Sequence, residues 1–239
     1  MDTKERRAST QSVPGEPPRK RHGRRWALAS LGVLVVLVVI AAAGLELAPA
    51  PAPLVLPTAH TGPLVGPRAG TWDVGAGSVA GFRVPETVLF MSNDVVGRTS
   101  AVAGSFVVSG DRVTATRFRV DLTTVKIGGK QQPQFARILG AHDQPEATFS
   151  LTEPINLSPG FASGKMTVAS ATGRLAMNRT SHLVTFTVSG RRYAATVQAA
   201  GSVQIEFSHW GIKAPAGYGP LGSLADHGVA EFLVALRRQ

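Results

Sequence analysis

The amino-acid sequence predicts a mainly β protein: an antiparallel, closed β-barrel of about eight strands with one or two short helices, preceded by one transmembrane helix. Three observations lead to this prediction. An apolar run occupies residues 26–45, a proline-rich segment follows it, and apolar and polar residues alternate with a period of two from Thr71 onward. The chain of 239 residues is 44% hydrophobic, which is enough for a globular core. It has no cysteine, which excludes disulfides, thiolate metal sites and a cysteine nucleophile.

The first 45 residues predict a membrane anchor. Residues 1–25 hold eight Lys and Arg against three Asp and Glu, and we expect a basic, disordered cytoplasmic arm. The run Trp26–Leu45 has twenty residues and no charge, and a helix of this length spans roughly 30 Å, the hydrocarbon thickness of a bilayer. The basic arm favours a cytoplasmic N-terminus. We therefore expect a single-pass protein of the cell membrane with an extracytoplasmic C-terminal domain; secretion after signal cleavage near Ala48 is the alternative.

Residues 46–70 predict a Pro/Ala-rich stalk between the anchor and the folded domain. Six prolines stand between residues 48 and 70. Proline fixes φ and removes a backbone donor, so this composition is typical of an extended, semi-rigid spacer. At ~3.1 Å per residue the stalk would hold the folded domain up to about 70 Å from the membrane.

Residues 71–239 predict the barrel domain. Glycine, serine and proline turns separate the strands, and a helix is expected over residues 132–141 with a weaker candidate at 85–92. A meander with one apolar face must close on itself or pair with a second sheet. The alternation is clearest over residues 112–121, 146–152, 184–188 and 203–208.

Closure of about eight strands leaves an interior that is either filled by side chains or wide enough for one ligand. A polar cluster stands where the expected helix meets the next strand, and its members Arg137, His142 and Asp143 are candidate head-group contacts. The candidate bore residues occupy the apolar positions of the alternating pattern in each strand, and we expect them to face the interior. They are Phe82, Phe106, Phe118, Phe149, Leu175, Met177, Val184, Phe186, Val203 and Ile205.

Other chemistry finds little support in the sequence. The histidines after residue 70 are not paired at a metal-ligand spacing, so no metal site is predicted, and no catalytic residue is predicted either. Basic residues after residue 70 are mostly scattered instead of forming a stripe with aromatics, which disfavours nucleic-acid binding. The sequence leaves a homodimer open.

The order of these elements resembles the YceI-like family of lipid-binding, lipocalin-like barrels, over nearly all of residues 71–239. The matching stretches are TWDVGAGSVAGFRV (71–84), VVGRTSAVAGSFVVSGD (95–111), FRVDLTTVKIG (118–128), ILGAHDQPEATFSLT (138–152), GRLAMNRTSHLVTFTV (173–188), IEFSHWGI (205–212) and GVAEFLVAL (228–236).

The resemblance implies an exported barrel that holds a long apolar amphiphile, a polyisoprenoid or a quinone-like lipid, in its bore, with no other cofactor and no reaction. Two alternatives come from other classes. One is a cell-envelope interaction module with a filled barrel and no ligand. The other is an enzyme with a pocket at the barrel mouth, where His142 and Asp143 would act as acid and base.

Overall fold

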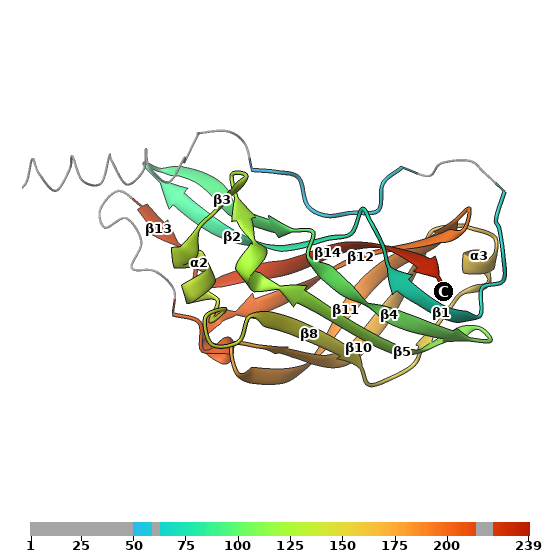
Figure 1. Cartoon of the computed structure of the whole chain (residues 1–239). Coiled ribbons are helices and arrows are strands. Elements are labelled where there is room, and N and C mark those ends of the chain that lie inside the picture. The colour runs from blue at the N-terminus through green and yellow to red at the C-terminus, as the bar shows by residue number, and fades with distance from the viewer. Residues whose placement is uncertain (1–49, 59–62, 214–221) are drawn as a thin grey trace, which may run out of the picture. The chain divides into compact units, whose positions relative to one another are not determined.

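The computed structural model describes residues 50–58, 63–213 and 222–239 (Figure 1). The expected cytoplasmic arm and the expected span Trp26–Leu45 lie outside these residues, so both stay predictions. In the part of the chain that is described, no helix is long and apolar enough to cross a membrane. The described residues all belong to one compact unit, Leu47–Gln239.

The described residues form fourteen strands with two short α-helices and two 3-10 helices. The helical elements are η1 (Leu122–Thr124), α2 (Pro133–Ile138), α3 (Pro159–Ala162) and η2 (Phe207–Trp210). The strands are β1 (Gly70–Val74), β2 (Val79–Val88), β3 (Met91–Thr99), β4 (Val102–Ser109), β5 (Arg112–Asp121), β6 (Lys126–Ile127), β7 (Lys130–Gln131), β8 (Glu146–Leu151), β9 (Ile155–Asn156), β10 (Thr167–Met177), β11 (Thr180–Tyr193), β12 (Thr196–Glu206), β13 (Gly222–Leu224) and β14 (His227–Arg238).

Antiparallel pairing closes eight of these strands into a barrel, in the order β1-β4-β5-β8-β10-β11-β12-β14, with β14 paired back to β1. Strand β14 meets β1 only through Leu236–Arg238, and its earlier residues Val229–Leu233 pair with β2 instead. The β2–β3 hairpin therefore continues the wall at the end of the barrel where α2 lies, while α3 lies at the opposite end (Figure 1). The predicted closed barrel of about eight strands with short helices is confirmed.

The helix predictions fare differently from the strand predictions. The expected helix at 132–141 is present as α2 but is shorter. The weaker helix candidate at 85–92 is wrong, because these residues form the end of β2, the turn and the start of β3. The two strands pair from Ala80 with Thr99 to Val88 with Met91. This pairing gives the backbone N–H and C=O groups hydrogen-bond partners that a helix would have supplied within itself.

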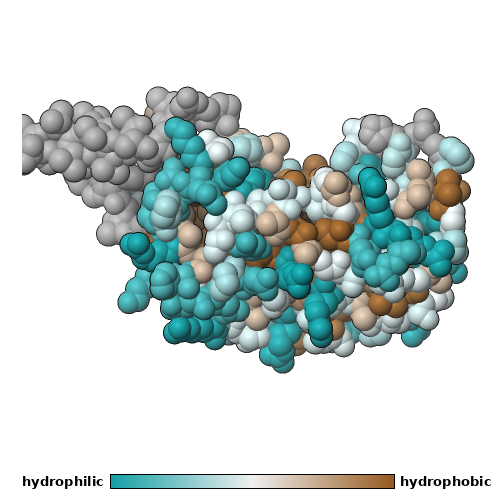
Figure 2. All heavy atoms as spheres, viewed as in Figure 1, coloured by the Kyte–Doolittle hydropathy of each residue, from teal (hydrophilic) through white to brown (hydrophobic). Residues whose placement is uncertain are grey.

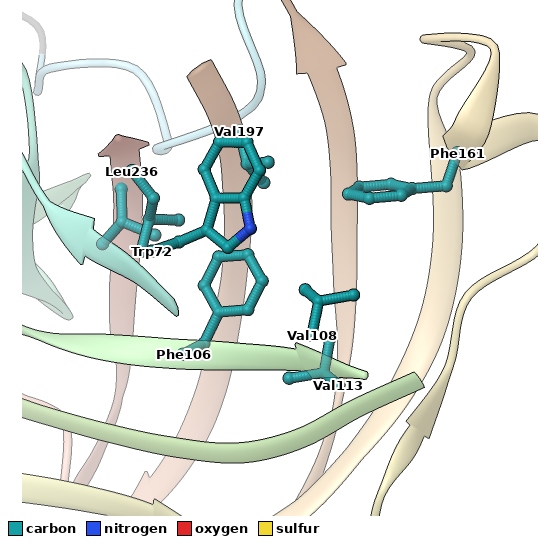
Figure 3. Close-up of a cluster of buried hydrophobic side chains, with 8 residues drawn as sticks. Trp72, Phe106, Val108, Val113, Phe161, Val197 and Leu236 are labelled. Atoms are coloured by element: carbon teal, nitrogen blue, oxygen red, sulfur yellow. The ribbon is translucent and has the colours of Figure 1, made fainter. Parts of the chain in front are cut away.

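Two apolar clusters fill the two ends of the barrel. At the α3 end, Trp72 is 1% exposed, its ring lies parallel to that of Phe106 with centroids 6.2 Å apart, and its Nε1 donates to the carbonyl of Arg68 at 3.0 Å. Figure 3 shows these side chains with Phe161 of α3 pointing into the same space. The cluster at the α2 end consists of Val84, Met177, Ile205, Phe207, Trp210 and Ile212.

The described parts of the proline-rich segment, residues 50–58 and 63–69, lie against the barrel, which differs from the free stalk that the composition suggests. Prolines leave neighbouring carbonyls without backbone partners, and arginines of the barrel supply the missing donors. These hydrogen bonds run from Arg83 to Pro51 O, from Arg98 to Ala52 O (3.3 Å), from Arg191 to Thr58 O (3.1 Å) and from Arg192 to Gly66 O (2.7 Å). In addition, the backbone N–H of Leu54 in the segment donates to Glu231 Oε2 of the barrel at 2.8 Å.

Candidate functional site

An apolar cavity of about 290 Å³ occupies the barrel interior. Seven of the eight strands that close the barrel, and also β2, contribute lining side chains, and nearly all of these side chains are aliphatic or aromatic. Thr116 of β5 is an exception, and its hydroxyl is buried without a hydrogen-bond partner. A wall of this kind repels water and polar solutes, so the site is suited to an apolar guest.

A row of three phenylalanines crosses the cavity wall. The ring of Phe186 meets Phe149 edge-to-face at 5.3 Å and Phe232 edge-to-face at 5.9 Å between centroids. Gly173 makes room for this row, because a Cβ at that position would lie 2.4 Å from the Phe149 ring. The rings thus take the space that side chains on neighbouring strands leave free.

Small residues on the inward face explain why the interior stays open. Ala169, Ala171 and Ala199 all line the cavity, on β10 and β12. An alanine reaches only one carbon from the backbone, so these positions do not fill the space across the barrel. Small side chains at these inward positions therefore contribute to the open interior.

The predicted bore residues lie on the inward face. Val184 does not border the cavity itself; it is half-buried and packs against the apolar cluster at the α2 end. Whether these side chains contact a ligand stays a prediction. The nine that line the cavity are Phe82, Phe106, Phe118, Phe149, Leu175, Met177, Phe186, Val203 and Ile205.

Sequence reasoning missed the lining residues that come from helices and turns. Phe135, Ile138 and Leu139, in or directly after α2, border the cavity, as do Leu122 and Val125 around η1. These segments are too short and irregular to show a period of two, so no alternation marks their inward side chains. The spacing of Phe135 and Ile138 by three residues within the expected helix was the available signal.

The three predicted head-group residues lie on the surface, away from the cavity lining. The His142 side chain is 85% exposed, and its Nδ1 lies 3.1 Å from Asp143 Oδ1. Arg179 Nη2 lies 3.3 Å from Asp143 Oδ2. The hydrogen bond from His142, followed by the charge of Arg179, holds the pKa of Asp143 below its usual value. Arg137 is exposed on α2, and none of the three residues borders the cavity.

This surface position removes the support for an acid–base site at His142, because that proposal needed a concave pocket beside the imidazole. Neither His142 nor Asp143 lines the cavity. Within residues 50–58, 63–213 and 222–239, no group of three or more His, Cys, Asp or Glu could hold a metal ion.

The two ends of the cavity are covered differently. At the α3 end, Trp72, Phe161 and Leu236 are each no more than 3% exposed and form a packed plug. At the α2 end, part of the border is the short helix α2, which has no fully buried residue. A six-residue helix with a half-buried apolar face is the weaker cover of the two, since few contacts hold it.

A closed antiparallel barrel with an apolar cavity defines the class of β-barrel that can enclose one small apolar molecule. The chain belongs to the YceI-like family: the YceI-like domain matches residues 72–231, as the resemblance in sequence predicted. No curated protein matches the chain.

Two of the solved structures that resemble this chain illustrate the shared fold. A polyisoprenoid binding domain from Saccharophagus degradans, implicated in plant cell wall breakdown, has a TM-score of 0.53 and 10% sequence identity, covering 72% of this chain and 100% of that one. BcnA from Burkholderia cenocepacia has a TM-score of 0.51 and 17% identity, covering 68% of this chain and 98% of that one. At these identities the likeness shows a shared fold.

Proposed function

We propose that this protein binds a long apolar amphiphile, of the polyisoprenoid or quinone-like class, in the barrel cavity. The observation that carries the proposal is the continuous apolar lining of the cavity, from Phe106 at one end to Phe135 and Leu139 at the other. The related domain from Saccharophagus degradans is described as polyisoprenoid binding, which agrees with this ligand class.

The cavity offers enough apolar surface for useful affinity. Burying about 400 Å² of prenyl surface at ~25 cal/mol/Å² gives roughly 10 kcal/mol before ordering costs. The volume of about 290 Å³ is near the lower end of typical ligand pockets. A slender chain suits such a space better than a bulky ring system, because it can follow a narrow bore.

The protein is further proposed to be membrane-anchored, with its barrel on the extracytoplasmic side. The twenty-residue apolar run and the basic arm before it support this topology. A role as a ligand-free interaction module would suit a barrel whose interior is filled, and the open cavity favours lipid binding over that alternative.

The test is recovery of lipid with the full chain, expressed in cells rich in isoprenoids, extracted in mild detergent and analysed by native mass spectrometry. Two variants form a matched pair on β10. Ala169→Phe places a ring in the cavity, and Ser170→Phe places the same ring on the outer face, because neighbouring residues of a strand point to opposite sides.

We expect the wild-type protein and Ser170→Phe to carry a solvent-extractable adduct, and Ala169→Phe to lose at least tenfold in occupancy while remaining folded by circular dichroism. Repeated recovery of the wild-type chain without an adduct would overturn the proposal. Equal occupancy in the two folded variants would also overturn it, since the ligand would then lie elsewhere.

A further inference from the structure

The turn between β2 and β3 exposes three consecutive apolar side chains. Phe90 is 98% exposed, Leu89 55% and Met91 50%. No charged residue stands between Glu86 and Asp94, so the whole end of the hairpin is uncharged. An exposed aromatic flanked by two large aliphatic side chains is costly in water and marks an interaction site.

The backbone of this turn is also unfavourable for the residues it contains. Leu89 and Phe90 adopt φ values of 49° and 68° in a two-residue loop, the pattern of a type I′ turn that favours Asn-Gly. The β10–β11 hairpin has a loop of the same kind and places the polar pair Asn178-Arg179 in it. The chain therefore has polar residues in one such turn and apolar residues in the other, where folding alone gives no reason for them.

The short length of chain between the predicted membrane span and the docked residues 50–58 limits how far the barrel can lie from the bilayer. Arg83 of β2 holds the carbonyl of Pro51, and Leu54 N donates to Glu231 of β14 at 2.8 Å. The predicted membrane span ends at Leu45, and residues 46–50 reach at most about 18 Å when extended. Arg83 stands six residues before Leu89 in the hairpin, or about 20 Å along the strand.

The same turn lies at the end of the barrel where α2 covers the cavity (Figure 1). Strand β13 pairs with β2 beside the turn, from Gly222 with Val88 to Leu224 with Glu86, and Leu224 borders the cavity. In the space-filling view of Figure 2, apolar surface lies mainly along the middle of the visible face of the barrel, between more polar regions. An apolar guest that leaves the α2 end would thus emerge near the exposed hairpin turn.

We propose that the β2–β3 turn, Leu89-Phe90-Met91, inserts into the surface of the lipid bilayer and places the α2 end of the cavity against it. This inference rests on the proposed function, because a bilayer is where an amphiphilic ligand resides. The docking of residues 50–58 on the barrel keeps the free part of the tether short. The barrel then sits at the membrane instead of about 70 Å away, the reach of a fully extended stalk.

Insertion can be measured with a probe on the turn, because the chain has no cysteine and one introduced thiol is unique. Phe90→Cys and Ser109→Cys, the latter exposed in the β4–β5 turn at the opposite end, are each labelled with an environment-sensitive fluorophore. The full chains are reconstituted into vesicles of phosphatidylcholine and phosphatidylglycerol, with and without brominated acyl chains.

We expect brominated lipid to quench the probe at residue 90 at least threefold more than the probe at residue 109. Equal, weak quenching at both positions would overturn the proposal and leave a protein partner as the occupant of the turn. Native mass spectrometry of the same preparations separates the two hypotheses. Quenching without a bound lipid adduct contradicts the proposed function, and an adduct without quenching contradicts only the insertion.

A second variant guards against a purely structural role of the turn. Leu89→Asn combined with Phe90→Gly supplies the residues that the turn geometry prefers. We expect this double variant to melt at the same or a higher temperature than the wild type, yet to take up lipid from the vesicle into which it is reconstituted at least fivefold more slowly. Unchanged uptake would overturn the proposal.

Discussion

Phe186 provides a quantitative test of the cavity wall, because it joins two aromatic partners on the inward face of β11. Phe186→Ala removes edge-to-face contacts with Phe149 and Phe232. Each such contact is worth roughly 0.5–1.5 kcal/mol beyond simple burial. Truncation of a fully packed phenylalanine costs about 3–5 kcal/mol in total. Since one side of this ring already borders the cavity, we expect the lower value, about 3 kcal/mol.

The assay is thermal melting of the full chain in mild detergent, followed by tryptophan fluorescence after the lipid has been extracted. A loss of 1 kcal/mol lowers Tm by roughly 2–4 °C in a domain of this size, so we expect a decrease of about 6–12 °C. Phe90→Ala is the matched control: the same atoms are removed from a side chain that is 98% exposed, and Tm should not change measurably.

The reasoning is refuted if Phe186→Ala lowers Tm by less than about 2 °C, since that would correspond to a loss below about 1 kcal/mol. The ring would then not be packed against its two neighbours as described. A decrease seen only before lipid extraction would show instead that the ring stabilises the ligand and not the wall.

Three further predictions concern the wall and the surface. Arg98 Nη1 lies 2.6 Å from Oε1 of the buried Glu231, and Glu231→Gln removes the carboxylate that pairs with this arginine. We expect the free energy of unfolding, measured by denaturant titration, to fall by about 3 kcal/mol, and a loss under about 1 kcal/mol would contradict this. Gly173→Val overpacks against the Phe149 ring and should lower the free energy of unfolding by about 1–3 kcal/mol. An unchanged denaturant midpoint would mean that the ring moves aside freely. The lowered pKa of Asp143 stabilises the fold above the carboxyl's unfolded pKa, and this contribution is lost as pH falls through the folded pKa. We expect an NMR titration of the wild type to place the pKa of Asp143 below its usual value, and Asp143→Asn to reduce the loss of unfolding free energy at acid pH. A normal pKa for Asp143 together with an unchanged acid dependence in the variant would contradict this.

Alternation in the sequence determined the strands and the inward face. The stretch 112–121, chosen from its period of two, is the strand β5 (Arg112–Asp121). Nine of the ten candidate bore residues line the cavity because successive side chains of a strand point to opposite faces, whatever the register. The charge distribution and the apolar run before residue 46 likewise yield a topology from sequence alone, which stays a prediction.

Features that depend on contacts between distant residues were decided only by the tertiary structure. Residues 85–92 form a hairpin because β2 finds a partner in β3, and local pattern did not reveal it. Residues 50–58 lie on the barrel because Arg83, Arg98 and Glu231 converge from three strands, so composition alone suggested a free stalk. The open interior depends on which inward side chains face each other across the barrel, and single-strand periodicity carries no information about that distance.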